Sequence, residues 1–352
     1  MKRFTWLLYG VLITLLMGEA ALRVGGYRPY RNADYRVSAK PNHAYVANSR
    51  LGIALAEGTY DILLNEQVAF RATHQPNGQR FVPKSSDEDS SWVAVLGCSF
   101  TYGYGVNDTE TFVARLQTQH PGTHWTNHAV PGYGTVQACL QVRALLDDSS
   151  RIPDRIVVVF HPFHLDRNAL TPAFRSAMRI GFRRSNPANQ ALLQGARFPV
   201  NTGLDTPVLA FKAWGNLYRP WPARESSALV YWGQQQRDAA ITRRLDPVAL
   251  TVPLLADIAE RCAAAGVPCW VVNLGGNTLT EAVRARLIER WEGDSRSANF
   301  HWVSVPFDFN SPAMTNQPVD IHPDVLGHQY IADKLEAALY GPDSMRQQQT
   351  SR

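Results

Sequence analysis

The feature that most constrains the fold of this chain is an alternation of apolar and amphipathic runs over residues 92–340. A short apolar run bounded by turn residues predicts a strand, and apolar residues three or four positions apart predict a helix. Strands that alternate with helices imply a parallel sheet with helices on both faces. The predicted strands are SWVAVLG, THWTNHAV, DRIVVVFH, PCWVVNLG and FHWVSVP, and the predicted helices are TETFVARLQTQ, TVQACLQVRALLDD, PVALTVPLLADIAERCAAAG, LTEAVRARLIERWEG and DVLGHQYIADKLEAALYG.

The ends of three of these helices carry capping residues. Thr109 precedes the first helix and Asp324 the last, where a side-chain oxygen accepts a hydrogen bond from a free N–H of the first turn. Gly266 follows the long third helix and suits a left-handed end. In a parallel sheet of this kind, ligands bind beyond the carboxyl ends of the strands, so we expect the chemistry there.

The first 25 residues predict a membrane segment. Lys2 and Arg3 precede FTWLLYGVLITLLMG, with no further charge before Glu19. Counting on through Leu22 reaches the ~20 residues of a membrane span. The basic residues keep the N-terminus in the cytoplasm. We expect an uncleaved signal anchor that crosses the inner membrane once and leaves the remaining chain in the periplasm. A cleaved signal peptide, followed by secretion, is the alternative.

The remaining chain divides into three parts. Residues 26–91 are polar and turn-rich with short alternating stretches, which predicts an irregular, β-containing lead-in ending in the linker KSSDEDSS. Residues 92–342 form the main domain, and residues 343–352 a polar tail. Within the main domain, residues 170–241 interrupt the alternation and are rich in Arg and Trp. This insertion is too long for a simple crossover, so we expect a lid or one wall of a cleft.

Charge and cysteine content exclude some classes of function. The net charge is +5, but the arginines are scattered and form no run that would follow phosphates, so no nucleic acid is expected. The four cysteines form no CxxC pair, so neither a metal nor a cofactor is expected. Cys262 and Cys269 lie close enough in sequence to pair in an exported domain. Burial of all four as small apolar residues is the other interpretation.

Three residues predict nucleophilic catalysis. Ser99 follows the first predicted strand, so its hydroxyl is expected at the rim of the sheet. A serine attacks only when a base removes its proton, and that base is typically a histidine held by a carboxylate. His322 and Asp320 stand on the loop before the closing helix, at the same edge of the sheet. Taken singly, each residue also fits a turn or a surface loop.

From Trp92 to Leu339 the chain resembles the SGNH (GDSL-type) hydrolases, which carry four short motif blocks. GCSFTYGYGV matches the first block and makes Ser99 the implied nucleophile. NHAVPGYGT matches the second, in which the Gly132 N–H donates to the oxyanion together with the N–H of Ser99. DIHPDVLGH matches the fourth and supplies the acid and the base. The resemblance implies a flavodoxin-like, three-layer α/β/α fold with a parallel sheet, and acyl transfer from esters.

The first and fourth blocks depart from the family pattern. Cys98 stands where the family has a structural Asp, and we favour its neighbour as the nucleophile because adjacent side chains of an extended chain point apart. Asp320 lies two residues before His322, whereas the commoner spacing of three falls on Val319. Asp308 and Asp324 are therefore kept as weaker candidates for the acid.

The third block reads VVVFHPFHLDRN and lacks the Asn–Asp of the family. Alignment by the preceding strand puts His164 at the position of the family's oxyanion-binding Asn. A neutral imidazole N–H can donate to an oxyanion as an amide does. Asn168 is the alternative donor, and a buried structural histidine is the other interpretation of His164.

These features together predict an exported, membrane-tethered serine esterase that hydrolyses O-acyl esters, acetyl esters among them. Export and the aromatic residues of the insertion point to an envelope or secreted polysaccharide, although the same aromatics also suit core packing. An acylated small molecule or a lipid ester is also compatible. The alternatives are an O-acyltransferase on the same site and a non-catalytic carbohydrate-binding protein with this fold. The aromatic residues are Trp214, Tyr218, Trp221 and Trp232.

Overall fold

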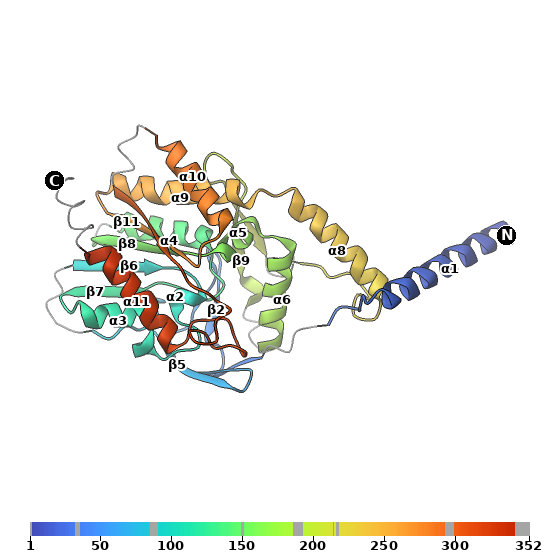
Figure 1. Cartoon of the computed structure of the whole chain (residues 1–352), viewed down its shortest axis with the longest axis horizontal. Helices are drawn as coiled ribbons and strands as arrows, with labels where there is room; N and C mark the ends of the chain where they lie inside the picture. The colour runs from blue at the N-terminus through green and yellow to red at the C-terminus, as the bar shows by residue number, and fades with distance from the viewer. Residues whose placement is uncertain are drawn as a thin grey trace.

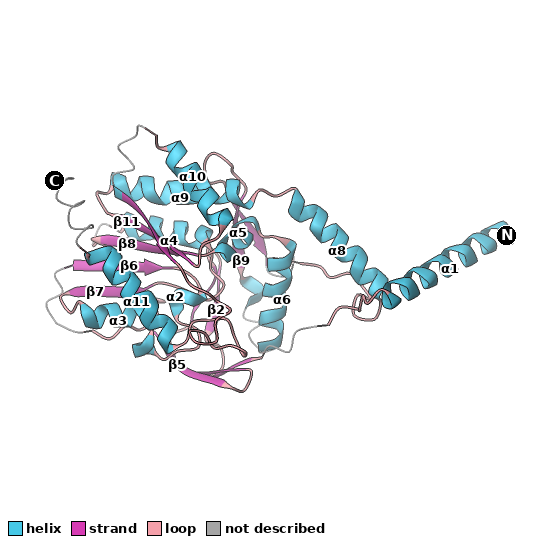
Figure 2. Ribbon diagram, viewed as in Figure 1, coloured by secondary structure: helices cyan, strands magenta, loops and turns pink. Residues whose placement is uncertain are grey.

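The computed structural model describes residues 2–31, 36–84, 91–148, 151–185, 193–213, 215, 218–292 and 299–341. Five parallel strands form the central sheet (Figure 2). Numbered along the chain, their spatial order is 2-1-3-4-5, the flavodoxin-like order, which confirms the predicted fold class. From one edge to the other the strands are β12 (Phe300–Val305), β11 (Cys269–Leu274), β8 (Arg155–Phe160), β6 (Ser91–Leu96) and β7 (Thr123–Asn127).

Helices cover both faces of this sheet because successive strand residues point to opposite sides. On β6, Ala94 and Leu96 belong to the apolar cluster under one helical layer, whereas Val93 and Val95 belong to the cluster under the other. The three layers predicted from the alternation are therefore present (Figure 1). One layer holds α4 (Thr135–Asp147), α5 (Pro162–Ala169), α9 (Pro247–Ala264) and α10 (Thr278–Arg290), and the other holds α3 (Phe112–Gln119) and α11 (Val325–Tyr340).

The residues before the sheet form small antiparallel sheets. One has the strand order β1-β4-β5 and the other pairs β2 with β3. Their apolar side chains share a third cluster with residues from loops at the carboxyl end of the main sheet, such as Tyr102, Val130 and Tyr133. The predicted linker lies largely outside the described residues. The strands are β1 (Val37–Lys40), β2 (Tyr45–Asn48), β3 (Gly52–Leu55), β4 (Gly58–Leu64) and β5 (Val68–His74).

The insertion contains helices and a two-stranded ribbon. Its Tyr218 is buried and donates a hydrogen bond to Asp238 (2.7 Å), whereas Trp221 and Trp232 are exposed. Trp214 and the polar tail lie outside the described residues. The elements are α6 (Pro172–Ser185), η2 (Leu193–Gly195), β9 (Arg197–Asn201), β10 (Leu209–Ala213) and α8 (Ala228–Arg243).

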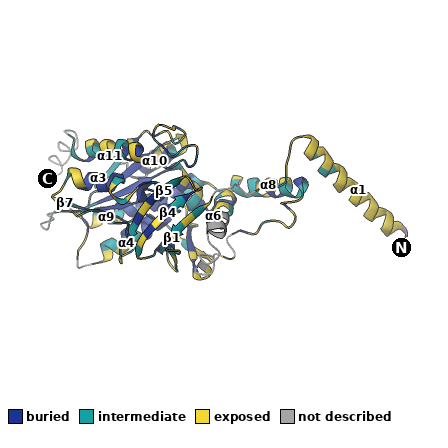
Figure 3. Cartoon of the chain, turned by 90° about the horizontal axis from the view of Figure 1, so that it is seen from below, coloured by how far each residue is buried: buried dark blue, intermediate teal, exposed yellow. Residues whose placement is uncertain are grey.

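The N-terminal helix α1 (Lys2–Val24) extends away from the main body and is exposed along most of its length (Figure 3). Its length and apolar composition are sufficient to cross a membrane. Its last turns meet the start of α8, where the Glu19 carboxylate accepts hydrogen bonds from the Ser227 hydroxyl (2.8 Å) and the N–H groups of Ala228 (3.0 Å) and Leu229 (2.8 Å).

Two predicted helix ends are confirmed and one is wrong. Asp324 caps α11 by accepting from the Gly327 N–H (2.8 Å), and Gly266 follows α9 with a left-handed φ of 69°. Thr109 lies instead inside the 3₁₀ turn η1 (Asp108–Glu110), and Thr111 caps α3. The tight turn starts first because Asn107 and Glu110 already satisfy each other's N–H groups there.

The four cysteines are buried free thiols. Cys262 at the end of α9 and Cys269 at the start of β11 are in hydrogen-bonding contact, and this contact together with burial raises the pKa of Cys269 well above its ordinary value. The two residues are close but occur as thiols, and all four cysteines are buried, as in the second interpretation of the sequence.

Candidate active site

Ser99 begins the short helix α2 (Ser99–Tyr102), three residues beyond the end of β6. The intervening turn requires Gly97, because a Cβ atom there would lie 2.1 Å from the Thr101 hydroxyl oxygen. Ser99 is buried at 6% exposure and lies at the carboxyl end of the sheet, as predicted. Its strand borders β8, and the chain order reverses between these two strands, which is where ligands bind in such sheets.

Cys98 is fully buried and packs into the apolar cluster under α3 and α11. Its thiol therefore occupies a core position on the chain next to the candidate nucleophile. This packing supports Ser99 over Cys98 as the residue that faces a substrate.

His322 and Asp320 form a hydrogen-bonded pair on the loop before α11. The His322 ring Nδ1 bonds to the Asp320 carboxylate, which also accepts the backbone N–H of His322 (2.9 Å). With Nδ1 engaged as a donor, the lone pair of the neutral ring is on Nε2, where a base must carry it. With Asp320 two residues before His322, one carboxylate therefore accepts both the ring Nδ1–H and the backbone N–H of the histidine.

The imidazole of His322 packs against the turn that carries Ser99. Its centroid lies 4.8 Å from the ring of Phe100 and 5.0 Å from the ring of Tyr104. Residues more than 200 positions apart in the sequence therefore meet at one edge of the sheet, as the placement of their loops predicted.

The loop that carries His322 is braced by Asn316. The backbone N–H of Asn316 donates to the His322 carbonyl (3.0 Å), and its side-chain amide donates to the same carbonyl (3.2 Å). The amide nitrogen of Asn316 also lies so close to Gly105 that a Cβ atom added to this glycine would be only 2.4 Å from it. The φ of Gly105 is +100°, a backbone conformation that favours glycine, so the two loops fit closely at this point.

Gly132 follows β7 and adopts a left-handed φ of 88°. Among the described residues, neither its N–H nor that of Ser99 has a backbone acceptor outside regular helices and strands. Two such N–H groups on neighbouring loops are the type of donors that hold an oxyanion. The predicted donors therefore come from the carboxyl ends of adjacent strands β6 and β7.

The segment after β8 holds both predicted side-chain donors. Asn168 takes part in two other hydrogen bonds, because its carbonyl accepts the Val136 N–H (3.3 Å) and its amide donates to the Thr251 hydroxyl (3.0 Å). His164 is buried, and its ring lies edge-on to Phe160 (5.8 Å). Burial, with Arg167 and His161 nearby, lowers the pKa of His164 well below its ordinary value, so its ring is neutral.

The two weaker candidates for the acid have structural roles. The Asp324 carboxylate caps α11, and the Asp308 carboxylate accepts the Asn310 N–H (2.9 Å) within its own turn. Among the described residues, no group of three or more His, Cys, Asp or Glu side chains is placed to hold a metal ion.

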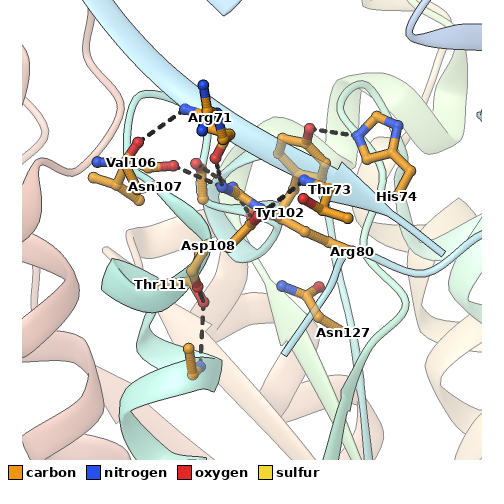
Figure 4. A network of polar contacts seen from close by, with 12 residues as sticks. Arg71, Thr73, His74, Arg80, Tyr102, Val106, Asn107, Asp108, Thr111 and Asn127 are labelled. Atoms are coloured by element: carbon orange, nitrogen blue, oxygen red, sulfur yellow. Dashed lines mark hydrogen bonds and ion pairs between the residues drawn. The ribbon is translucent and has the colours of Figure 1, made fainter. Parts of the chain in front are cut away.

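A buried arginine that sequence reasoning missed holds the turn after Ser99 in place (Figure 4). Arg80, which is 0% exposed, uses all five of its N–H donors. One donates to the Asp108 carboxylate (3.0 Å), and the others donate to backbone carbonyls. The carbonyl acceptors are those of Tyr102 (2.6 Å), Gly103 (2.6 Å), Val106 (2.6 Å) and Arg71 (3.2 Å).

This cluster joins the small N-terminal sheets to the main domain. The backbone N–H of Arg80 donates to the Asn127 carbonyl at the end of β7 (3.0 Å), and Asp108 also accepts the Thr73 N–H (3.0 Å). His74 bonds to the Tyr102 hydroxyl (2.7 Å). No sequence pattern marked this cluster, because Arg80 stands alone in a polar segment and its partners come from three distant stretches.

No family model matches the sequence, and no curated protein matches it. Among solved structures, the chain is similar to the psychrotrophic esterase EstA from Pseudoalteromonas sp. (13% identity, 74% of this chain and 100% of that chain covered, TM-score 0.40). It is also similar to a member of the lipolytic protein G-D-S-L family from Veillonella parvula (11% identity, 71% and 98% covered, TM-score 0.34). A carbohydrate esterase is a further similar structure (14% identity, 75% and 68% covered, TM-score 0.37).

Proposed function

We propose that this protein is a serine esterase with Ser99 as nucleophile, His322 as base and Asp320 as the orienting acid. The observation that carries the proposal is the His322–Asp320 pair, whose imidazole packs on the ring of Phe100, the residue that follows Ser99. The pair leaves Nε2 of the histidine as the ring nitrogen that can take a proton from a serine hydroxyl.

The reaction begins when the Ser99 oxygen attacks the ester carbonyl carbon and its proton passes to Nε2 of His322. The electron pair of the carbonyl bond moves to its oxygen, and the N–H groups of Ser99 and Gly132 stabilise the oxyanion. The alcohol then leaves with the proton from His322. Water, activated by the same base, attacks the acyl-enzyme and releases the acid, and Asp320 stabilises the charged imidazole in each step.

The first prediction concerns the nucleophile. With the full chain in detergent and p-nitrophenyl acetate as substrate, Ser99→Ala and His322→Ala are each expected to lower kcat by more than about 10³-fold, since members of a catalytic triad act as a unit. Cys98→Ala is the matched control, because it changes the adjacent side chain and is expected to keep activity. Activity that survives Ser99→Ala, or is lost with Cys98→Ala in a folded protein, contradicts the assignment.

The substrate we propose is an O-acylated polysaccharide outside the cytoplasm. Two indole rings support this choice, because Trp221 and Trp232 are exposed on the insertion and can stack on sugar rings. Incubation with acetylated oligosaccharides separates the outcomes. Free acetate supports the esterase, whereas acetyl groups appearing on an added unacetylated oligosaccharide identify an O-acyltransferase on the same site. Saccharide binding that persists without release or transfer of acetate identifies a non-catalytic binding protein.

We further propose that α1 stays attached as a single-pass anchor in the inner membrane, with the main domain in the periplasm. The hydrogen bonds of Glu19 to the start of α8 support this, because cleavage after the apolar segment removes the carboxylate that caps α8. The Arg23 guanidinium strengthens the same contact by donating to the Ser226 carbonyl (2.9 Å). Intact mass of the membrane-extracted protein tests it: a mass that includes residues 1–25 supports the anchor, and a shortened chain in the soluble fraction identifies a cleaved signal peptide.

A further inference from the structure

His161 and Ser99 follow two neighbouring strands at the point where the chain order of the sheet reverses. β6 and β8 are paired in parallel with Leu96 opposite Val158. Ser99 lies three residues beyond the end of β6, and His161 directly follows the end of β8. His161 is the first residue after β8 and caps helix α5, so its position is set by both elements.

The hydrogen bonding of His161 fixes which ring nitrogen carries the proton. Nδ1 accepts the backbone N–H of Phe163 (3.1 Å), so in the neutral ring the proton is on Nε2. His161 is 97% buried (3% exposed), and Nε2 has no hydrogen-bond partner among the described residues. A buried donor without an acceptor is uncommon in folded proteins and needs an explanation.

The ring of His161 packs among aromatic residues that adjoin the candidate nucleophile and base. Its ring centroid is 4.6 Å from that of Phe100 and 4.5 Å from that of Phe309. Phe100 is the residue that follows Ser99, and its ring also contacts His322 (4.8 Å). The two histidines therefore stand against the same phenyl ring.

Both ring nitrogens of His164 are also buried without a hydrogen-bond partner among the described residues, so the two histidines differ in their surroundings. The ring contact of His164 is with Phe160, inside the strand, and it lies one turn further along α5. The group that lowers the pKa of His161 besides burial and Arg167 is His322, whereas His164 is affected by Arg167 and His161. Of these two histidines, only His161 is close enough to the base for its pKa to be affected by His322.

We propose that His161, in place of His164, is the third oxyanion donor of the reaction, through its Nε2–H. The proposal rests on the esterase function above. As the Ser99 oxygen bonds to the carbonyl carbon, the carbonyl electron pair moves onto oxygen, and Nε2–H of His161 donates a hydrogen bond to it. His161 keeps its proton throughout, and the proton of Ser99 goes to His322 alone. Burial keeps the ring of His161 neutral, so it remains a donor and does not compete with the base.

The test compares two histidines of one segment in the full chain. His161→Phe keeps the ring volume and removes the donor, and is expected to lower kcat about 10²–10³-fold with little change in KM, as for loss of one oxyanion donor. His161→Gln restores an N–H and is expected to recover at least tenfold of that loss. His164→Phe is the matched control and is expected to change kcat less than fivefold. Melting temperatures establish that each variant is folded.

Binding of a boronic acid, whose tetrahedral adduct with serine imitates the intermediate, provides the second readout. Its affinity is expected to fall in proportion to kcat in His161→Phe. A folded His161→Phe enzyme with unchanged kcat overturns the proposal, and so does a loss that follows His164→Phe instead. Ser99→Ala measured in parallel separates the two levels: if Ser99→Ala keeps activity, the esterase assignment fails, and if it abolishes activity while His161→Phe does not lower it, only the role of His161 fails.

Discussion

The two loops that form the candidate site are held in place by different means. The turn after Ser99 depends on a charge from another part of the chain, because Arg80 binds three carbonyls between Tyr102 and Val106. The loop with His322 depends on itself, because Asn316 and Asp320 on that loop hold the histidine. One side of the site therefore requires the small N-terminal sheets to be folded, and the other side requires only correct local hydrogen bonding.

This difference gives the N-terminal segment a role that its irregular sequence does not indicate. A buried guanidinium whose five donors are all used leaves no freedom to the backbone that it binds, and loss of any partner leaves a buried charge unpaired. We infer that the segment is part of the catalytic architecture. The variants below separately test the catalytic pair, the support of the Ser99 turn by the Arg80 cluster, and the support of the His322 loop by its own residues.

The largest effect is expected on the histidine side. Asp320→Asn removes the charge that stabilises the imidazolium and allows the wrong tautomer of His322, which lowers kcat by about 10⁴-fold in comparable triads. Stability is expected to change little, since the amide oxygen can still accept the His322 N–H. Steady-state kinetics and thermal melting measure the two quantities. Normal kcat in this variant excludes Asp320 and returns Asp308 to consideration.

The next effect is on stability and comes from the nucleophile side. Arg80→Met fills a similar volume but leaves Asp108 and the bound carbonyls without their donor, and is expected to cost about 3–5 kcal/mol of unfolding free energy. Denaturant titration measures it. Arg71→Met is the matched control, because the pair of Arg71 with Asp61 is more than 60% exposed on both sides and is expected to contribute little to the free energy of unfolding. Equal losses in the two variants contradict the remote support of the turn.

The same division separates what the sequence could and could not predict. Apolar periodicity predicts the five strands and their helices. It also predicts at which edge of the sheet the candidate site lies, because Ser99 and His322 each come after a strand of one parallel sheet. These are local patterns combined with a topological rule, so a single chain suffices to predict them.

Contacts between distant, isolated polar residues could not be predicted in this way. Arg80 meets acceptors at Arg71, between Tyr102 and Asp108, and at Asn127, and only the folded chain brings these three stretches together. Sequence reasoning did not consider His161 beside His164 for a related reason. Both follow the same strand within four residues, and which ring faces Phe100 depends on where α5 begins, a boundary that periodicity does not determine.

A pH experiment again tests how the Arg80 cluster supports the turn after Ser99, with a smaller expected effect on stability. Burial lowers the pKa of His74 to about 4, while its hydrogen bonds to Ala56 and Tyr102 hold it within the Arg80 cluster. Below the ordinary pKa of about 6.5, the unfolded chain binds a proton that the folded chain does not, so stability is lost as pH falls from about 6.5 towards 4. Stability is fully present above that window.

The melting temperature measured across this window is therefore expected to fall with acidification, and to fall less steeply in His74→Gln. Some slope should remain, because His328 is also buried and its pKa is lowered to about 3. Identical slopes in the two proteins would show that His74 is not held neutral by the cluster.

The smallest effect is expected from local support of the histidine loop. Asn316→Ala removes the side-chain hydrogen bond to the His322 carbonyl but keeps the backbone bond from residue 316 to the same carbonyl, so the expected loss is about 1 kcal/mol with kcat reduced less than tenfold. Asn316→Asp, which keeps the size but turns a carboxylate towards the same carbonyl, is expected to destabilise the protein at least as much. If Asn316→Ala destabilises the protein as much as Arg80→Met does, then the histidine loop is no more self-sufficient than the nucleophile turn. In that case the two sides of the site form one cooperative unit, coupled where the Asn316 amide meets Gly105.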